Sequence, residues 1–437
     1  MSFTLDVELA MGKHLKVKRH HLHNGLTLIS AVDKSAPILA YQTWFAVGSR
    51  NERAGSTGMA HFFEHLMFNQ TKSLALGEFD RIIEATGGDS NAATWNDWTY
   101  YRNNIPAEEL EMIVKLESER MTDLVLTPEV VEAEREVVMN ERLERVDDDI
   151  DGFASEELFR HAFQSHPYHW PTIGWMSDIK SLSIPQMESF YHQYYSPDNA
   201  IIVVVGDFEE ATLLSLIESH YGGISASGVQ KTSLAPEPTQ VQERVYCFQK
   251  EVSSPRLLNG YKSPGQGHPD WPLLMFTSSL LAGSASSPLY RKLVIEEELA
   301  SSVYCDLMPF ADPSLLEISV VLTRDADLET VQTMIDECIS DIANDAEIES
   351  EITKVRNLVE TEFWSGLSTM DGKAEALGHY QCIHGDFNKL FVMADELANV
   401  STEDVRRVTQ TYLQKNQRTV IRIVPEDAPE DEVSSKT

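Results

Sequence analysis

The chain has 437 residues, enough for two large domains or three smaller ones, and a hydrophobic content of 42%, which can build real cores and excludes a disordered tail protein. Its 35 Lys and Arg residues against 69 Asp and Glu residues give a net charge of −34, so its surface repels nucleic-acid phosphates and anionic lipid headgroups. We therefore expect no nucleic-acid partner and no binding to a membrane surface. A cationic partner is compatible with this charge, and so is a simple role in solubility or adaptation to salt.

Cysteine usage and hydrophobic runs narrow the class of protein further. The four cysteines, Cys247, Cys305, Cys338 and Cys382, show no Cys-x-x-Cys spacing, so we expect reduced core residues rather than a zinc knuckle or a disulfide framework. No stretch approaches the roughly 20 apolar residues of a membrane span, and the strongest run, residues 200–205, has the length of a strand. The N-terminal residues lack the apolar centre of a signal peptide, so we expect a cytoplasmic protein, or a periplasmic one if a leader has been removed.

The first element with unusual polar residues is an apolar helical segment at residues 58–68, which follows a strand-like run at residues 26–32. His61, Glu64 and His65 interrupt this segment. At i and i+4, the two histidines project from one helical face, where their ring nitrogens can hold one metal ion, and Glu64 stands on the same side. Zinc is the natural candidate, with Glu64 taking a proton from water and passing it to a leaving amine; the pentapeptide is the zincin motif written backwards. The alternative is a helix whose histidines are satisfied in the core.

Residues 91–95, with the sequence Asn-Ala-Ala-Thr-Trp, predict a short polar strand. A turn at Asn96-Asp97 and a second arm from Trp98 make this strand the first arm of a hairpin, which can lie at the edge of a sheet. An ordinary hairpin that packs its tryptophans is the alternative. Phe68 and Trp95 could line a pocket, but aromatic residues at such spacing are usually core.

A catalytic zinc ion needs a third protein ligand, and a later segment of the chain offers a candidate. Thr127-Pro128 forms a helix start, after which Glu134, Val137, Val138 and Glu141 lie at i, i+3, i+4 and i+7. Valines between the two glutamates predict that the carboxylates face inward, where they need a cation or a hydrogen-bond donor. The alternative is a solvated helix face, because the helix carries further acidic residues and two arginines.

Two segments half a chain apart share one pattern. A capped helix at Ser183–Tyr194 leads through a turn into a strand at residues 201–205, and a capped helix at Ser401–Tyr412 leads through a turn into a strand at residues 419–424. The offset of 218 residues is about half of the 437 residues and predicts a duplicated domain.

The duplication predicts an N-terminal domain at residues 1–223, which carries the candidate metal site, and a homologous C-terminal domain at residues 241–437 without it. A Gly-, Ser- and Pro-rich linker at residues 224–240 joins them, and an acidic tail begins at about residue 426. Strand-like stretches alternate with long amphipathic helices in each half. We expect an α+β fold in which each domain has a mixed, mostly antiparallel sheet covered by helices.

Taken together, these motifs resemble the pitrilysin and mitochondrial processing peptidase family of zinc metallopeptidases, the inverzincins. The resemblance covers nearly the whole chain. It rests on His61-Phe-Phe-Glu64-His65, on Glu141 at 76 residues after His65 with Glu134 before it, on residues 87–94 with Thr99-Tyr100, on the His166-Pro-Tyr168 loop that leads to Gly174, on the Tyr195–Asn199 turn, and on the duplication.

The resemblance implies a set of functional residues. His61, His65 and Glu141 would hold one zinc ion per chain, and Glu64 would be the general base. Glu134 would be a second carboxylate that orients a ligand or the water molecule. In addition, the family's peptide substrates pair with the strand edge that here carries Asn91 and Ala92, beside a pocket that Phe68 could line.

The chain also departs from the family pattern in its second half. Many active relatives have an Arg and a Tyr, seven residues apart, where this chain has Val294 and Ser301. This predicts a heterodimer in which a homologous partner subunit supplies the Arg/Tyr pair; a homodimer, or donors at Arg291 and Tyr304, are the alternatives. A shift of three residues would, however, place Tyr304 on the opposite face of a strand.

The function that these patterns predict is a zinc-dependent endopeptidase that hydrolyses extended peptides or small unfolded proteins. The alternative is a non-catalytic, peptide-holding or structural core-type subunit of the same fold. We favour catalysis because His61, Glu64, His65, Glu134 and Glu141 are all present.

Overall fold

The computed structural model describes residues 3–11, 15–229, 234–344 and 348–428, and the chain divides into two compact units. Unit 1 comprises residues 1–142, 170–233 and 365–390, and unit 2 comprises residues 143–169, 234–364 and 391–437. The predicted linker at residues 224–240 and the predicted acidic tail lie partly outside the described residues.

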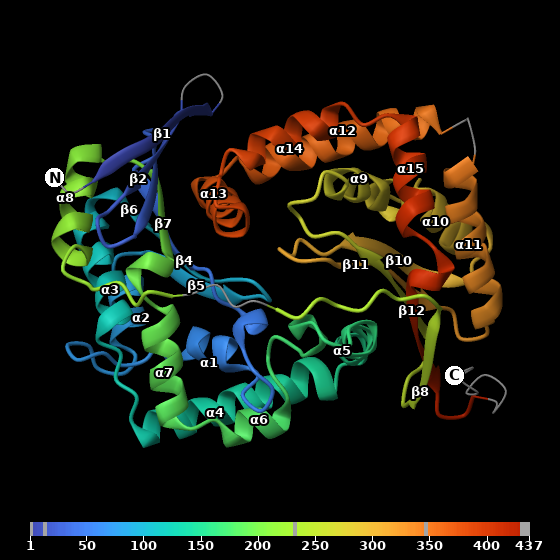
Figure 1. The fold of residues 1–437 in the computed structure, drawn as a ribbon, viewed down its shortest axis with the longest axis horizontal. Helices are drawn as coiled ribbons and strands as arrows, with labels where there is room; N and C mark the ends of the chain where they lie inside the picture. The colour runs from blue at the N-terminus through green and yellow to red at the C-terminus, as the bar shows by residue number, and fades with distance from the viewer. Residues whose placement is uncertain (1–2, 12–14, 230–233, 345–347, 429–437) are drawn as a thin grey trace. The chain divides into compact units, whose positions relative to one another are not determined.

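Unit 1 is built on a mixed seven-stranded sheet in the order β1-β2-β3-β7-β4-β6-β5 (Figure 1). Its strands are β1 (Thr4–Met11), β2 (Leu15–His21), β3 (Thr27–Val32), β4 (Ile38–Phe45), β5 (Asp89–Thr94), β6 (Thr99–Pro106) and β7 (Ala200–Gly206). Its helices are α1 (Met59–Leu66), α2 (Glu78–Ala85), α3 (Leu110–Thr122), α4 (Pro128–Arg142), α6 (Met176–Ser181), α7 (Ile184–Tyr194), α8 (Glu210–Tyr221) and α13 (Met370–His384). Among these described strands of unit 1, only β3 and β7 pair in parallel. Every residue of β7 is buried.

Helices cover both faces of this sheet. Successive residues of β4 point to opposite faces. Thr43 donates to Glu117 of α3, whereas Gln42 donates to Asp371 of α13. Helices α3 and α13 therefore lie on opposite sides of the sheet (Figure 1).

Unit 2 has a mixed five-stranded sheet in the order β10-β11-β9-β12-β8. Its strands are β8 (Arg244–Lys250), β9 (Arg256–Ser263), β10 (Ala300–Leu307), β11 (Ser314–Leu322) and β12 (Arg418–Pro425). Its helices are α5 (Ile150–Ala162), α9 (Trp271–Ala282), α10 (Pro288–Tyr290), α11 (Leu328–Asn344) and α15 (Thr402–Tyr412), and most of α12 (Glu349–Gly366) and α14 (Lys389–Ala398) belongs to it. Val420 packs into the core with α9, α11 and α15, whereas Ile421 packs against α5. The two faces of this sheet thus have separate apolar layers.

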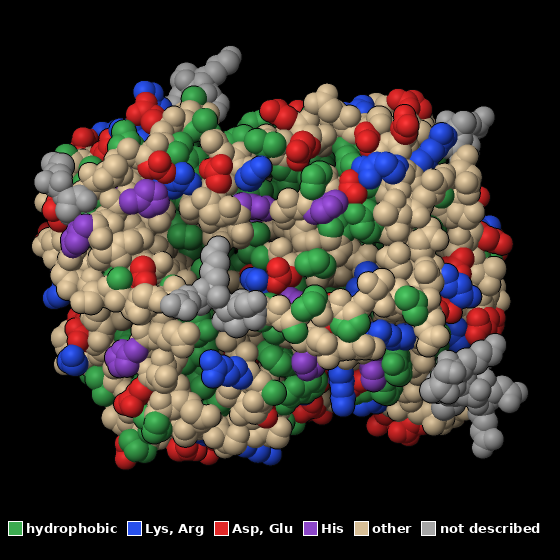
Figure 2. Space-filling view, viewed as in Figure 1, with side chains coloured by type: hydrophobic (Ala, Val, Ile, Leu, Met, Phe, Trp, Pro, Cys, Tyr) green, Lys and Arg blue, Asp and Glu red, His purple; other side chains and the backbone are tan. Residues whose placement is uncertain are grey.

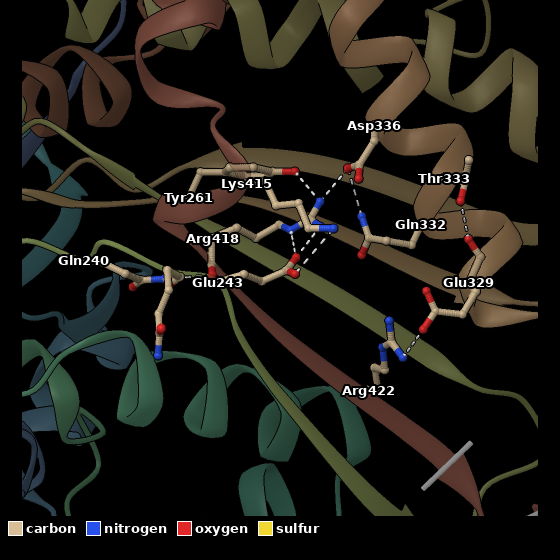
Figure 3. Close-up of polar contacts among 11 residues, drawn as sticks. Gln240, Glu243, Tyr261, Glu329, Gln332, Thr333, Asp336, Lys415, Arg418 and Arg422 are labelled. Atoms are coloured by element: carbon tan, nitrogen blue, oxygen red, sulfur yellow. Dashed lines mark hydrogen bonds and ion pairs between the residues drawn. The ribbon is translucent and has the colours of Figure 1, made fainter. Parts of the chain in front are cut away.

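A buried arginine joins the elements of unit 2 at the start of β12 (Figure 3). The Nε atom of Arg418 donates to Glu243 at 2.9 Å, and its guanidinium also contacts Asp336 of α11 and the hydroxyl of Tyr261 on β9. Its side chain is only 2% exposed. The charge is tolerated in the interior because two carboxylates pair with it.

The strand order supports the predicted duplication. Numbered along the chain, the strands of unit 2 follow the order first, fifth, second, fourth, third, and β3 to β7 of unit 1 repeat that order. The backbone N–H of Ser183 donates to Gln186 at 3.0 Å before β7, and that of Ser401 donates to Asp404 at 3.1 Å before β12. The predicted α+β fold with mixed, mostly antiparallel sheets is confirmed.

Two equivalent helices are exchanged between the halves of the chain. Helix α5 belongs to the first half yet packs on β12 and β9 of unit 2, and α13 belongs to the second half yet packs on β4 and β7 of unit 1. A division of the chain at a single linker would therefore differ from the two compact units. Residues 143–169 belong to unit 2, and residues 365–390 belong to unit 1. The boundaries 1–223 and 241–437 of the predicted homologous domains stay a prediction.

Both exchanged helices begin with the same local structure. Asp149 accepts a hydrogen bond from Gly152 N at the start of α5, and Thr369 accepts one from Gly372 N at the start of α13. A Cβ atom on Gly152 would lie 1.9 Å from a backbone carbonyl oxygen, and one on Gly372 would lie 2.0 Å from another. Glycine is required at both positions because the backbone of the preceding turn passes so close.

The surface and the cysteines agree with the composition. All four cysteines lie in the described part of the chain as half-buried thiols. Figure 2 shows acidic side chains over many parts of the visible face, with Lys and Arg between them, so the charge of −34 is not gathered in one patch there. Among the described residues, no helix has both the length and the hydrophobicity needed to cross a membrane.

Candidate metal centre

The two histidines lie on the short helix α1. Its Met59, Phe62, Phe63 and Leu66 side chains are buried and hold the helix against unit 1. His61 is 8% exposed, and His65 and Glu64 are half-buried. The ring centroids of His61 and His65 are 4.8 Å apart. The i, i+4 spacing thus places both imidazoles side by side, as predicted.

Helix α4 brings a glutamate to both rings. The Oε2 atom of Glu141 lies 3.4 Å from Nε2 of His61 and 3.2 Å from Nε2 of His65. The side chains of Glu134 and Glu141 are each only 17% exposed. The prediction that these carboxylates face inward is confirmed, and the alternative of a solvated face is wrong for them.

The arginines of α4 are buried as well. Arg135 donates to the backbone carbonyls of Ile179 and Leu182, and Arg142 donates to that of Gly174 at 2.9 Å. These bonds anchor α4 to residues 174–182. The two arginines therefore do not mark a solvated face.

The two valines on α4 behave differently. Val138 is fully buried, but Val137 is 49% exposed, so the expectation that both face inward is wrong for Val137. Each residue turns the helix by about 100°, so Val137 and Val138 lie on opposite sides of the Glu134–Glu141 stripe. Only the side that carries Val138 faces the core.

Glu134 orients the ring of His65. Its Oε1 atom lies 3.0 Å from Nδ1 of His65, and its Oε2 atom accepts from Nδ2 of Asn69 at 3.0 Å. Asn69 also donates to the backbone carbonyl of His65 at 3.2 Å. With Nδ1 engaged, the Nε2 atom of His65 is left to face Glu141. Asn69 was not among the predicted site residues, although its position four residues after His65 is a signal for contact across one helical turn.

The charges of these groups depend on one another. Burial would lower the pKa of His65, but hydrogen bonds and charge interactions with Glu134 and Glu141 raise it to about 9. Burial would raise the pKa of Glu134, but hydrogen bonds from His65 and Asn69 hold it below its usual value. The contacts with the two glutamates therefore favour the charged form of the His65 ring.

The donor atoms fit a zinc ion. One ring nitrogen of His61, one of His65 and a carboxylate oxygen of Glu141 all lie within 4.8 Å of one another. A tetrahedral site with bonds of about 2.0–2.1 Å separates neighbouring donors by about 3.3–3.4 Å, close to the 3.2 and 3.4 Å found between Glu141 and the two rings. Two imidazoles and one carboxylate are also the ligand set of several catalytic zinc sites, which keep one position open.

The predicted hairpin lies beside this helix and is confirmed. Strand β5 pairs antiparallel with β6 and ends the order of the seven-stranded sheet. Ala92 pairs with Tyr101, whose hydroxyl donates to Phe63 of α1, so Ala92 points to the face that carries α1. Asn91 is exposed and points to the opposite face, and its Oδ1 atom accepts the backbone N–H of Ala92 at 2.9 Å. An added strand could therefore accept the N–H of Ala92 only after the side chain of Asn91 releases it.

Comparison with known proteins identifies the family. The description "Insulinase (Peptidase family M16)" matches residues 27–174, and "Peptidase M16 inactive domain" matches residues 181–358. The zinc protease PqqE of Helicobacter pylori is 30% identical over 434 residues, which span 97% of this chain and 98% of that protein. The chain belongs to peptidase family M16. The resemblance seen in the sequence is thereby confirmed.

Two further similarities extend over most of this M16 chain. A crystal structure of a protease from Helicobacter pylori has a TM-score of 0.89 at 30% identity, with 94% of this chain and 100% of that chain covered. The β subunit of the mitochondrial processing peptidase of Blastocladiella emersonii is 24% identical over 420 residues, or 94% of this chain and 89% of that protein.

Phe68 is packed among other side chains, whereas Trp95 is partly exposed. The ring of Phe68 lies edge-to-face with Phe79 at 5.8 Å, and the guanidinium of Arg120 lies 5.5 Å from its centroid. Phe68 is half-buried within this cluster, so its role in substrate binding stays a prediction. Trp95 is 42% exposed and lies against Trp98.

In the second half of the chain, Val294 and Ser301 occupy the positions of the expected Arg and Tyr. Val294 packs against the core of unit 2, and the hydroxyl of Ser301 donates to the backbone of Val321 at 3.2 Å. Arg291 pairs with Glu296 at 3.2 Å, and Tyr304 on β10 is 58% exposed.

Proposed function

We propose that this M16 chain is a zinc-dependent endopeptidase that hydrolyses extended peptides or small unfolded proteins. The observation that carries the proposal is the convergence of His61, His65 and Glu141, at 3.2 and 3.4 Å, beside a glutamate on the same short helix. Its relative in Helicobacter pylori is named a zinc protease.

The ligands and the base have separate tasks in this proposal. His61, His65 and Glu141 hold the zinc ion, and Glu134 fixes the ring of His65 through Nδ1. A zinc ion at this position would polarise the scissile carbonyl group and make a water molecule more acidic. Glu64, which is half-buried on α1, takes the proton from that water and passes it to the leaving amine.

Substrate binding is proposed at the edge of β5. An extended peptide pairs its backbone with this terminal strand, which gives affinity with little demand on sequence. Side chains that alternate along the peptide then point in turn toward α1 and away from it. Phe68 contributes to the apolar surroundings on the α1 side.

The proposal includes a homologous partner subunit. Val294 has no hydrogen-bond donor, and the short hydroxyl group of Ser301 donates to the backbone of Val321. Neither residue replaces the Arg/Tyr pair, and losing one such donor commonly costs about 2.7–4 kcal/mol. A relative 24% identical to this chain is named a subunit of a peptidase. Full peptidase activity of the purified chain alone would contradict this division of donors.

The alternative function is a non-catalytic subunit that holds peptides or builds an assembly. The description "inactive domain" for the match to residues 181–358 is the observation that favours it. This alternative assigns no role to the metal-binding set His61, His65 and Glu141.

Zinc content and activity of the Glu64→Gln variant separate these functions. We expect one zinc ion per chain in both the unchanged protein and the variant, because Glu64 is not a ligand. With the partner subunit present, only the unchanged protein should cleave an unfolded peptide. A zinc-free chain, or equal cleavage by both proteins, would favour the non-catalytic subunit.

A further inference from the structure

The residue at the N-cap position of helix α1 has no side chain that could cap the helix. Gly58 occupies the N-cap position with φ of 85°, and no side chain is available there to accept the first N–H groups. A Cβ atom at this position would lie 2.5 Å from the carbonyl oxygen of Ile173. The positive φ and this close approach both require glycine, so the cap must come from another residue.

Glu52 supplies that cap from outside the helix. Its Oε2 atom accepts the N–H of Gly58 at 2.8 Å, and its Oε1 atom accepts the N–H of Ala60 at 2.8 Å. Glu52 is only 7% exposed and directly follows a single helical turn at Ser49–Asn51. Burial raises the pKa of this carboxyl group well above its usual value, and the hydrogen bonds from Ala60 and Gly58 oppose that shift.

The two ends of α1 depend on different contacts. At the C-terminal end, Tyr101 donates to the carbonyl of Phe63 at 3.1 Å, and Asn69 donates to that of His65 at 3.2 Å. The N-terminal end depends on Glu52 and on Thr57, whose N–H and hydroxyl donate to Asp178 at 3.1 and 2.8 Å. A helix of eight residues is not stable by itself, so such contacts decide where its side chains lie.

We infer that Glu52 is a positioning residue for the metal centre, because its carboxylate fixes the first turn of α1 and thereby places His61 relative to His65 and Glu141. His61 is the third residue of the helix, next to the bonded N–H of Ala60, whereas His65 lies in the last turn. Loss of the cap should therefore displace His61 more than His65. The inference rests on the proposed role of these residues as zinc ligands.

Zinc affinity of the Glu52→Gln variant tests the inference. The amide keeps the size of the side chain but turns an NH₂ group toward one of the two backbone N–H groups, so one hydrogen bond is lost. Competition between the complete chain and a chelating dye for zinc alone should show affinity about 10- to 100-fold weaker than in the unchanged protein. Unchanged affinity would overturn the inference.

A matched control lies in unit 2. Glu237 accepts the backbone N–H groups of Gln164, Ser165 and His166 at 2.7–2.9 Å, so Glu237→Gln makes the same chemical change among residues of unit 2. This control should keep the zinc affinity of the unchanged protein. An equal loss in both variants would indicate general destabilisation and would contradict a specific role of Glu52.

Hydrogen exchange of the metal-free chain provides a second measurement, which does not depend on zinc. In Glu52→Gln, the N–H groups of residues 58–61 should exchange faster, while those of residues 65–67 should keep their protection. Uniform exchange along α1 would contradict the inference. If the unchanged protein binds no zinc, the proposed function fails, and the exchange pattern still decides whether Glu52 fixes the first turn.

Discussion

The Nδ1 atom of His65 lies 3.0 Å from Oε1 of Glu134, and this contact joins α1 to α4 at the metal centre. The contact fixes the ring so that its other nitrogen faces Glu141. It should therefore matter for zinc binding although Glu134 is not a ligand in the proposal.

Replacement of Glu134 by Gln should weaken zinc binding by about 10- to 100-fold, because the ring of His65 loses its charged partner. The pKa of His65 in the metal-free protein should fall at the same time, since Glu134 contributes to its value of about 9. Chelator competition and an NMR titration of His65 check the two effects. Glu136→Gln changes an exposed residue of the same helix and should alter neither quantity.

The stability of the metal-free protein should depend on pH through His65. Its pKa of about 9 in the fold exceeds the value of about 6.5 in an unfolded chain. Protonated His65 therefore stabilises the fold fully below about pH 6.5, and this contribution, at most about 3 kcal/mol, is lost as the pH rises to about 9. Urea unfolding should show a stability difference between the unchanged protein and His65→Ala that is larger at pH 6 than at pH 9.5. A difference of equal size at both values would contradict the pairing.

Replacement of Ala92 by Pro should weaken peptide binding at the edge of β5. The N–H of Ala92 donates to the side chain of its neighbour Asn91. In the proposed complex this N–H turns to the incoming peptide instead, and proline removes the donor. One hydrogen bond contributes about 0.5–1.5 kcal/mol, so KM should rise about 2- to 10-fold while zinc content stays constant.

Replacement of Asn91 by Ala makes the opposite change at the same edge, since it releases the N–H of Ala92 for an incoming strand. KM for an extended peptide should stay the same or fall. A rise in both variants would indicate damage to the hairpin instead of a binding edge.

Replacement of Gly378 by Ala should destabilise unit 1. A methyl group there would lie 2.2 Å from Nε1 of Trp44, where α13 packs on β4. Alanine normally stabilises a helix interior relative to glycine by about 1 kcal/mol, so a loss of about 1–3 kcal/mol would report the close contact. Denaturant unfolding measures it. Gly366→Ala, which meets no atom within 4 Å, should cause no such loss.

The metal centre could be predicted from the sequence because helical spacing is local information. His61 and His65 share a face at i and i+4, and the stripe with Glu134 and Glu141 has the same periodicity. Glu52 could not be predicted in this way, since it reaches the helix start from outside the helix. The exposure of Val137 was likewise missed, because the pattern does not say which side of the stripe faces the core.

The duplication was predicted from two capped helices, each followed by a turn and a strand, but neither the strand order nor the exchange of α5 and α13 could be predicted in this way. Both helices lie between other helices along the chain, and the residues of a helix face do not specify which of two similar sheets that face will cover. Only the contacts with β12 and β4 reveal the exchange.

That exchange has a consequence for synthesis on the ribosome. The face of the first sheet that carries Gln42 and Trp44 is covered by α13, which ends at His384. The emerging polypeptide must expose this apolar surface until residue 384 has been translated. A stop codon in the Gly- and Ser-rich stretch near residue 228 would yield a fragment with an uncovered, aggregation-prone sheet.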